Sequence, residues 1–380
     1  MSLEPASPAP RRRDELDVLR GVLLVLMAVT HLPTRLSLYS SQPFGFVSAA
    51  EGFVFLSAFL VGSTYSRKLA ERGSEYVRTR LWQRASKLYI AHLALLLFAF
   101  TVAAGIAVVS GRPALRNHLS VYFDSPLWAS IGGPLLLYQP PLLDVLPMYI
   151  VFLVSTPLLL KIAARQGWWP LLTCSGLLWL FAQLDGRRLV YGKLAALAGL
   201  QVPIDAFGAF DWFAWQLVWV AGLWFGTRHI HRRQAGARAT ARGLPVLLTA
   251  AVATTVAFFI WRYHSGFELD AIGNSSMFDK WHLGPLRVLN FAALAYVVSH
   301  IVLPTLGGLR LRILSMLGRA SLAVFTAHVP FVVLSRGLII DDATPLTVAQ
   351  EVLVVALTLA AMLFVAWRTG GRERLAAAPA

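Results

Sequence analysis

The sequence predicts an all-α protein that crosses a membrane about ten times, with both ends of the chain on the cytoplasmic side. Three observations support this prediction. First, 57% of the 380 residues are hydrophobic and 14% are charged, and the mean hydropathy is +0.62. A soluble domain has about 45–50% apolar and about 25% charged residues, so the composition excludes that class. The other two observations are ten apolar segments and an uneven distribution of lysine and arginine.

The apolar segments have the length of membrane spans. A helix needs about 20 mostly apolar residues to cross about 30 Å of hydrocarbon. Trp168 and Trp169 flank the shortest segment, as interface anchors do. We expect spans at residues 16–33, 47–65, 88–110, 144–162, 168–184, 211–228, 244–262, 286–304, 315–336 and 346–367.

Lysine and arginine are concentrated in every second connection. With a cytoplasmic N-terminus, 23 of the 34 lie on the cytoplasmic side and ten on the other, with Arg20 inside a helix. Such an excess is typical of cytoplasmic loops and predicts an even number of spans. The net charge of +15 therefore reflects topology, and nucleic acid is not expected as a partner. We expect cytoplasmic tails at 1–15 and 368–380 around one transmembrane domain at 16–367; the oligomeric state stays open.

The connections expected on the outer side are long. Residues 111–143, 185–210 and 263–285 exceed the roughly 2–8 residues usual between packed helices. They are rich in proline, glycine and aromatic residues, which favours folded lids and places function at the outer face. Cys174 is the single cysteine, so no internal disulfide is possible, and no metal-binding motif is present.

The first apolar segment carries Asp17, Arg20 and His31, although a charged group in mid-membrane costs roughly 2.5–3.5 kcal/mol. Arg20 and His31 lie three helical turns apart, so they share one face at a separation of about 16 Å, with Asp17 near Arg20. One interpretation is that these side chains only reach the two interfaces. We favour a polar stripe that lines a cavity. A cleaved signal peptide over 11–33 is disfavoured because acidic residues interrupt its basic start.

The second segment begins with a carboxylate. Glu51 enters at a depth comparable to His31, where it would orient the imidazole and raise its basicity. The alternative is that Glu51 caps its own helix. Small residues, including Gly52 and Gly62, would let a neighbouring helix approach closely. A cation channel or pump would be expected to carry several acidic residues in the middle of its spans, and this sequence does not. The stripe therefore fits group transfer across the membrane better than cation transport.

Arg20, ten residues and then His31 resemble the R-x10-H signature of the membrane-bound acyltransferase-3 superfamily, and the chain resembles its OpgC type. In FVFLSAF, Ala58 stands where the superfamily usually has glycine, and the histidine of SLAVFTAHVPF is closer to the superfamily than to OpgC members. The matching stretches are LDVLRG (16–21), SAAEGFVFLSAF (48–59), LDVLPMYIVFL (143–153), FAWQLVWVAGLWFG (213–226), LGPLRVLNFAALAYVV (283–298) and LGRASLAVFTAHVPF (317–331).

This resemblance implies a multi-pass enzyme of the bacterial inner membrane that succinylates periplasmic glucans. It implies a cytoplasmic acyl donor, succinyl-CoA or acetyl-CoA, a glycan hydroxyl as acceptor, and no tightly bound cofactor. His31 would be the catalytic histidine, oriented by Glu51, and Arg20 with Asp17 would bind the donor. The chemistry agrees, because a hydroxyl needs a base and a guanidinium binds phosphate or carboxylate bidentately.

Other polar residues near the outer ends of the spans are candidate acyl or sugar contacts. Each has a structural alternative, such as a helix start or an interface anchor. A rival function from another class is a transporter or flippase for a lipid-linked sugar, and a third is a glycan-binding scaffold without chemistry. The candidates are Asp144, Tyr149, Lys280, Arg287, Asn290 and His328.

Overall fold

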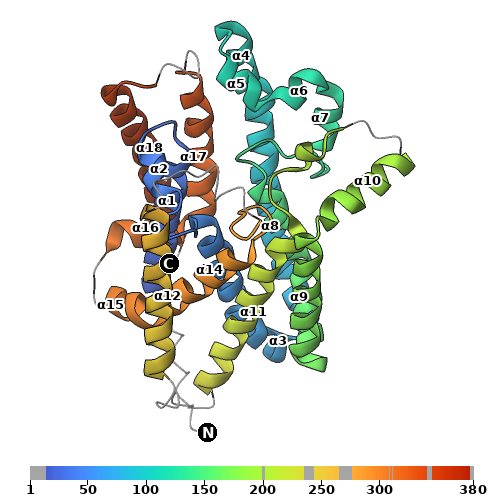
Figure 1. Ribbon diagram of the computed structural model, residues 1–380, viewed down its shortest axis with the longest axis vertical. Coiled ribbons are helices and arrows are strands. Elements are labelled where there is room, and N and C mark those ends of the chain that lie inside the picture. Colours follow the sequence, from blue (N-terminus) through green and yellow to red (C-terminus); the bar gives the residue numbers. More distant parts are fainter. Residues whose placement is uncertain are drawn as a thin grey trace.

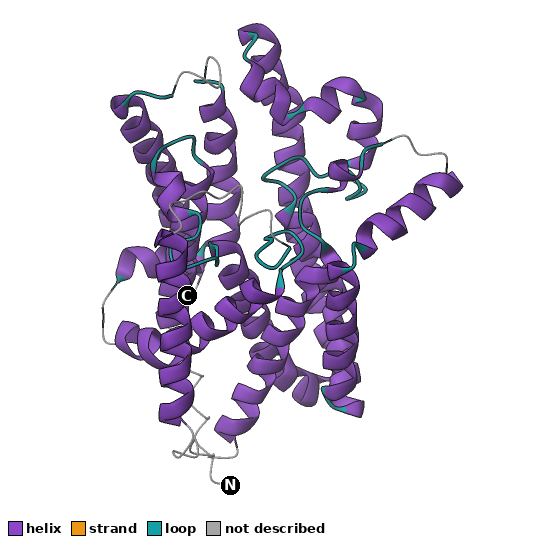
Figure 2. Cartoon of the chain, viewed as in Figure 1, coloured by secondary structure: helices purple, strands orange, loops and turns teal. Residues whose placement is uncertain are grey.

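The computed structural model confirms the predicted helical class. Within the part of the chain that it describes, every regular element is a helix and no strand occurs (Figure 2). The description covers residues 14–198, 202–234, 244–264, 276–307, 309, 311–339 and 345–376.

Groups of long helices alternate along the chain with groups of short ones. Long helices form the body, and the connections between them carry short ones. The elements are α1 (Asp14–His31), α2 (Leu36–Ser40), α3 (Ala49–Phe98), η1 (Ala99–Ala103), α4 (Ala104–Ser110), α5 (Pro113–His118), α6 (Ser120–Asp124), α7 (Pro126–Gly132), α8 (Val145–Gln166), α9 (Trp169–Gln183), α10 (Gly186–Ala198), η2 (Ile204–Phe207), α11 (Trp212–Gln234), α12 (Leu244–His264), α14 (Pro285–Val297), η3 (Val298–Val302), α15 (Leu303–Gly307), α16 (Arg312–Arg319), α17 (Ser321–Arg336) and α18 (Val348–Ala376).

Helix α1 packs closely against α16. Two glycines make the contact possible, because a Cβ at Gly21 would overlap the Leu314 carbonyl and one at Gly318 would overlap the carbonyl of Asp17. The acidic residues of α1 fall in its first turn, where the helix dipole favours negative charge. The close contact fixes the position of Arg20, which directly precedes Gly21.

Helix α3 begins with a capping box in which Ser48 and Glu51 satisfy each other's backbone groups. Gly73 divides it into two limbs, with φ at 78°, a value that glycine adopts readily. The first limb packs against α11, and the predicted role of its small residues is confirmed at Gly62, where a Cβ would overlap the Leu223 carbonyl. The first limb holds most of the second predicted span, whereas the third begins within the second limb and continues through η1 and α4.

Five helices in the described part are long and apolar enough to cross a membrane, or six if the bent pair α16 and α17 forms one span. Every predicted span is helical, although some run over consecutive helical elements. Helix α1 carries four charged residues, and α9 has only 15 residues. The chain is a multi-pass membrane protein, whereas the number ten and the orientation of the termini stay predictions. The ninth predicted span is bent, because α16 and α17 meet at 90°.

The connecting helices gather at one end of the bundle. In Figure 1, α4 to α7 and α10 lie toward the top of the view, as folded lids would. Of the third long connection, residues 265–275 lie outside the described residues, as do residues 1–13 of the expected N-terminal tail. Helix α18 continues to Ala376, so the expected C-terminal tail begins as helix.

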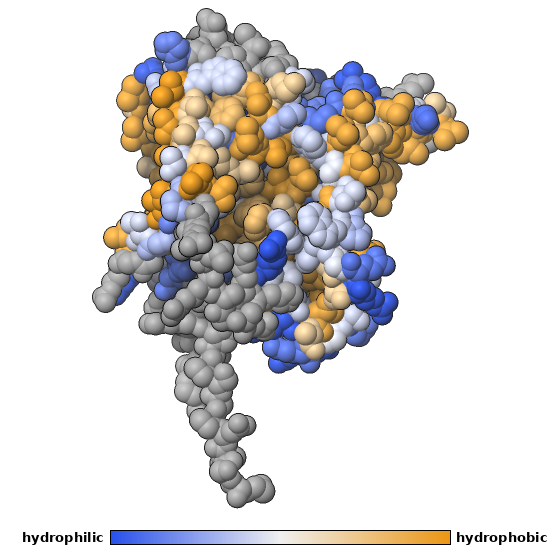
Figure 3. Space-filling model, turned by 60° about the horizontal axis from the view of Figure 1, so that its bottom comes forward, coloured by the Kyte–Doolittle hydropathy of each residue, from blue (hydrophilic) through white to orange (hydrophobic). Residues whose placement is uncertain are grey.

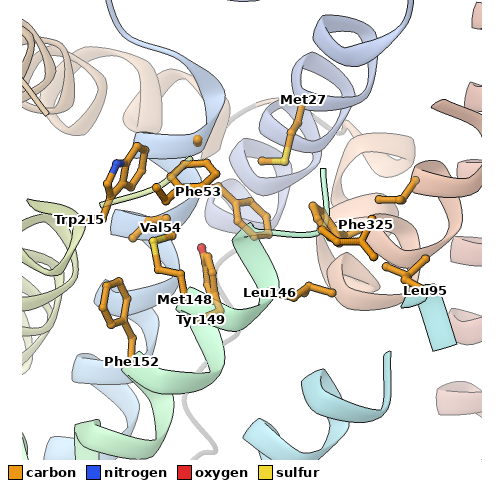
Figure 4. Packing of buried hydrophobic residues seen from close by; sticks show 14 of the residues in the cluster. Met27, Phe53, Val54, Leu95, Leu146, Met148, Tyr149, Phe152, Trp215 and Phe325 are labelled. Atoms are coloured by element: carbon orange, nitrogen blue, oxygen red, sulfur yellow. The ribbon is translucent and has the colours of Figure 1, made fainter. Parts of the chain in front are cut away.

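The surface and the core both suit a bilayer. On the face seen in Figure 3, apolar side chains form a broad band and hydrophilic ones gather toward its edges. Inside, aromatic and aliphatic residues of α1, α3, α8, α11 and α17 pack into one cluster, part of which Figure 4 shows. The polar cavities described below open beside this cluster.

Candidate functional site

Two cavities lie along the polar face of α1. The larger, called here the His31 cavity, has a volume of about 500 Å³ and is lined by His31. The smaller, the Arg20 cavity, has a volume of about 60 Å³ and is lined by Arg20. Both ends of the predicted stripe therefore face a cavity.

The His31 cavity brings together four of the residues selected from the sequence. His31 comes from the last turn of α1, and His328 faces the same space from α17. Asp144 lies directly before α8, and Lys280 belongs to the connection before α14. A base, a second imidazole, a carboxylate and an ammonium group thus converge from four different segments.

The segment 276–284 holds Lys280 in place through a network of hydrogen bonds. The Asp279 carboxylate accepts from the backbone N–H of Trp281 and of His282, each at 3.0 Å. The Lys280 ammonium lies 4.7 Å from the centre of the Trp281 ring. Burial lowers the pKa of Lys280, Arg287 acts in the same direction, and Glu51 and Asp144 oppose it. An ammonium group against an indole ring is a surface on which a sugar can stack.

His282 also lines the His31 cavity. In the sequence it directly follows Lys280 and Trp281 in a candidate sugar-binding segment, but its carboxylate partners were not predicted. Its Nδ1 contacts the Asp279 carboxylate, and its Nε2 lies 3.9 Å from the buried Asp211 carboxylate. The Asp279 hydrogen bond raises the pKa of His282 although burial opposes it. The sequence signal was the Asp-x-x-His spacing, which places a carboxylate beside an imidazole.

Helix α10 supplies a further cation to the His31 cavity, Arg187. Its guanidinium donates to the Gly208 carbonyl at 2.6 Å and to the Ile204 carbonyl at 3.3 Å. The Asp144 carboxylate accepts from the neighbouring Ala209 N–H at 3.3 Å. The segment around η2 is therefore tied to both α10 and the start of α8, and this wall of the cavity is built from loops.

The Arg20 cavity is built from helices alone. Arg20 donates a hydrogen bond to the Ser321 hydroxyl at the start of α17, and its guanidinium lies 5.9 Å from the centre of the Phe53 ring. Ser57 and Tyr149 add two more hydroxyl groups to the lining. Among the described residues that line this cavity, none is aspartate or glutamate.

Arg84 is a second arginine on the Arg20 cavity and was missed in the sequence. It lies on the second limb of α3, near Tyr65 and Tyr149, and within the described part of the chain it has no ion-pair partner. Its neighbours Leu81 and Ala85 are buried, which marks this face of the helix as internal. That pattern was the available signal.

Tyr149 lies on a different cavity from the one expected. The sequence placed it with Asp144 on the acceptor side, but it lines the Arg20 cavity. Tyr149 follows Asp144 by five positions, which explains the difference, since it lies more than one turn deeper along α8. Its hydroxyl is buried and lies near the Ser57 hydroxyl on the same cavity.

Glu51 does not contact His31. It is fully buried, forms an ion pair with Arg287 of α14, and accepts from the backbone N–H of Ser48 at 3.1 Å. The capping alternative therefore describes its contacts, and the ion pair was not anticipated. Asn290, one turn beyond Arg287, accepts from the Phe46 N–H at 2.8 Å. Both α14 residues are buried and hold neighbouring segments through these contacts, and neither lines a cavity.

Asp17 also lies away from both cavities. It is buried at the contact between α1 and α16, where its carboxylate lies 3.5 Å from Arg319 Nε.

Among the described residues, no group of three His, Cys, Asp or Glu side chains is arranged to hold a metal ion. The larger cavity presents three imidazoles, and the smaller one presents two guanidinium groups.

Comparison with known proteins gives one match. The family described as OpgC protein matches residues 12–374, which is nearly the whole chain. No curated protein and no solved structure matches the chain. The family match and the apolar helices together indicate an acyltransferase of membranes.

Proposed function

The chain belongs to the OpgC family, and on that premise we propose that it is an integral membrane O-acyltransferase of the bacterial inner membrane. It moves a succinyl or acetyl group from a coenzyme A thioester to a hydroxyl group of a glucan outside the cytoplasm. The acyltransferase-3 superfamily is the wider group in which we place it. With a cytoplasmic N-terminus, the Arg20 cavity lies toward the donor and the His31 cavity toward the acceptor.

The donor end is supported by the charge of the Arg20 cavity. Arg20 and Arg84 present two guanidinium groups beside apolar walls, and the described lining has no carboxylate. A buried positive charge favours an anion, and guanidinium groups bind phosphate and carboxylate with paired hydrogen bonds. The donor carries both kinds of anion when its acyl group is succinyl.

The acceptor end is supported by the size and lining of the His31 cavity. Its volume of about 500 Å³ lies within the range of roughly 300–1,000 Å³ that is typical of ligand sites. Trp281 offers an aromatic face, while Lys280 and Asp144 offer a donor and an acceptor for sugar hydroxyls. A glucan unit needs this combination, because sugars present apolar faces and polar edges.

The proposed reaction takes place at His31. The imidazole accepts the proton of the glucan hydroxyl while that oxygen attacks the thioester carbonyl carbon. The tetrahedral intermediate collapses with loss of the coenzyme A thiolate, which receives the proton from the imidazolium. A new ester C–O bond forms, the C–S bond breaks, and the histidine returns to its neutral form. Lys280 lies where a positive charge would stabilise the oxyanion.

One observation carries the proposal: an imidazole and a guanidinium from the same helix each line a cavity, and the two cavities adjoin through shared wall residues of α8 and α17. A transporter needs a path large enough for the whole cargo. An acyltransferase needs only the acyl end of the donor to pass, which agrees with the small volume of the Arg20 cavity.

The test uses purified protein in vesicles with succinyl-CoA or acetyl-CoA and periplasmic glucans. Mass spectrometry should show a gain of about 100 Da per succinyl group or about 42 Da per acetyl group transferred. His31→Gln should abolish the gain. His300→Gln is the matched control, because His300 is exposed and lines neither cavity. Transfer that survives in His31→Gln, or substrate flux without transfer, would contradict the proposal.

A further inference from the structure

Four helices, α1, α3, α8 and α17, line both cavities. On α1, Arg20 precedes His31, and on α17, Ser321 precedes His328 along one face. On α8 the order is reversed because that helix runs the other way, from the His31 cavity toward Tyr149. The two cavities are therefore consecutive compartments between the same walls.

Two residues line both cavities, Phe325 of α17 and Val145 of α8. Phe325 follows Ser321 by four residues and precedes His328 by three, so it stands between the two polar positions on its helix. Val145 is the first residue of α8, directly after Asp144. The border between the compartments is thus apolar on both sides, although polar groups lie one turn away in each direction.

Phe325 is held firmly at this border. Its side chain is 5% exposed, and its ring meets the His328 ring edge to face, with centroids 5.1 Å apart and planes at 78°. Figure 4 shows it in the same packed cluster as Met27, Leu146 and Tyr149. Close-packed interiors resist added volume, so whatever passes this point must fit beside the phenyl ring.

We propose that Phe325, with Val145, forms the constriction between the two cavities and selects by size the acyl group that reaches His31. This role rests on the proposed acyl transfer, in which the donor enters at the Arg20 cavity. The ring admits an unbranched acyl chain, such as acetyl or succinyl, and rejects a branched one. Truncation of the ring should relax this selection, because one methylene group changes discrimination in an apolar pocket by roughly 10–200-fold.

The first test measures acyl preference with acetyl-, propionyl-, butyryl- and isobutyryl-CoA as donors. Phe325→Ala should raise the rate with isobutyryl-CoA relative to acetyl-CoA by about 10-fold or more, and Phe325→Trp should lower it. Phe331→Ala is the matched control, since Phe331 lies on the same helix, is 38% exposed and lines neither cavity. An unchanged preference in folded Phe325→Ala would overturn the proposal.

The second test needs no enzymatic activity. In a Cys174→Ser background, a cysteine is placed on the His31 cavity by Ala50→Cys or on the Arg20 cavity by Ser57→Cys. These positions are seven residues apart on α3 and so share one face. A small anionic methanethiosulfonate reagent is then added to one side of right-side-out or inverted vesicles.

The two cysteines should react from opposite sides of the membrane while Phe325 is present. Phe325→Ala should let the cysteine at position 57 react from the side that reaches position 50, and Phe331→Ala should not. Reaction of both cysteines from one side with Phe325 intact would overturn the constriction. A protein that transfers no acyl group yet shows this labelling would instead contradict the proposed function alone.

Discussion

The two cavities differ in what builds their walls. The Arg20 cavity is enclosed by side chains of α1, α3, α8, α11 and α17, and its volume is about 60 Å³. The His31 cavity is closed on one side by helices and on the other by the segments 139–145, 204–210 and 280–282, and its volume is about 500 Å³. A helix-lined space is rigid and small, whereas a loop-lined one takes larger and more varied ligands.

This difference suggests a division of labour between the compartments. A small cavity with two guanidinium groups discriminates by charge and size. A large cavity with three histidines, a lysine and a tryptophan discriminates by hydrogen bonding and stacking. Substitutions should therefore separate, with donor affinity changing on the Arg20 side and the chemical step changing on the His31 side.

The largest effect should follow from removing the base. His31→Gln keeps a polar side chain of similar reach but cannot accept the hydroxyl proton, so kcat should fall by about 10²–10⁴-fold with little change in donor KM. Steady-state rates with acyl-CoA and glucan measure this. A rise in donor KM at unchanged kcat would place His31 with the donor and remove the contrast between the cavities.

Glu51→Gln tests whether this carboxylate belongs to the chemistry or to the fold. Its partners are Arg287 and Ser48, and it lines neither cavity. Removing one member of a buried ion pair destabilises a protein by about 3–5 kcal/mol, so the unfolding midpoint should fall. The molecules that remain folded should retain their kcat.

The matched control for that variant is Glu75→Gln, an exposed residue on the same helix. Its unfolding midpoint should stay at the wild-type value. If Glu51→Gln unfolds like the control but loses its kcat, then the orienting role predicted from the sequence is right and the structural one is wrong.

The two cavities also differ in how many of their residues could be predicted from the sequence. Arg20 and His31 were found because helical geometry fixes the spacing of residues on one face. Lys280 and Asp144 were selected only as members of motifs near helix ends, and the contacts of the neighbouring His282 were not predicted, because no periodicity governs loops. The pair of Glu51 and Arg287 is separated by 236 positions, and nothing local in the sequence indicates such a contact.

Arg84→Met should have an intermediate effect confined to the donor. Loss of one charged hydrogen-bonding group should raise the KM for acyl-CoA by about 10–100-fold, since such bonds contribute roughly 1.5–3 kcal/mol, and leave kcat nearly unchanged. Arg80→Met is the control, because Arg80 is exposed one turn earlier on α3. Equal effects of the two variants would mean that Arg84 acts only through surface charge.

The smallest effect should be a pH dependence of folding stability that arises from the loop segments of the His31 cavity alone. Asp279 raises the pKa of His282, with smaller contributions from Asp211 and Asp185, so the folded protein binds this proton more tightly than the unfolded chain does. The resulting stabilisation is complete below the ordinary value of 6.5 and is lost as pH rises through the raised pKa. Because His282 is half-exposed, solvent screening keeps the change small.

Thermal unfolding of the wild type and of Asp279→Asn, followed from acid to alkaline pH, measures that change. The wild type should unfold at a higher temperature than Asp279→Asn, and this difference should shrink as the pH rises above 6.5. The unfolding temperatures of Arg84→Met and Arg80→Met should differ from each other by an amount that does not change with pH. A constant gap between the wild type and Asp279→Asn would mean that the histidine stays neutral beside its carboxylate. The loop segments that line the His31 cavity would then be held by backbone hydrogen bonds alone. A pH-dependent stability would no longer distinguish the His31 cavity from the Arg20 cavity.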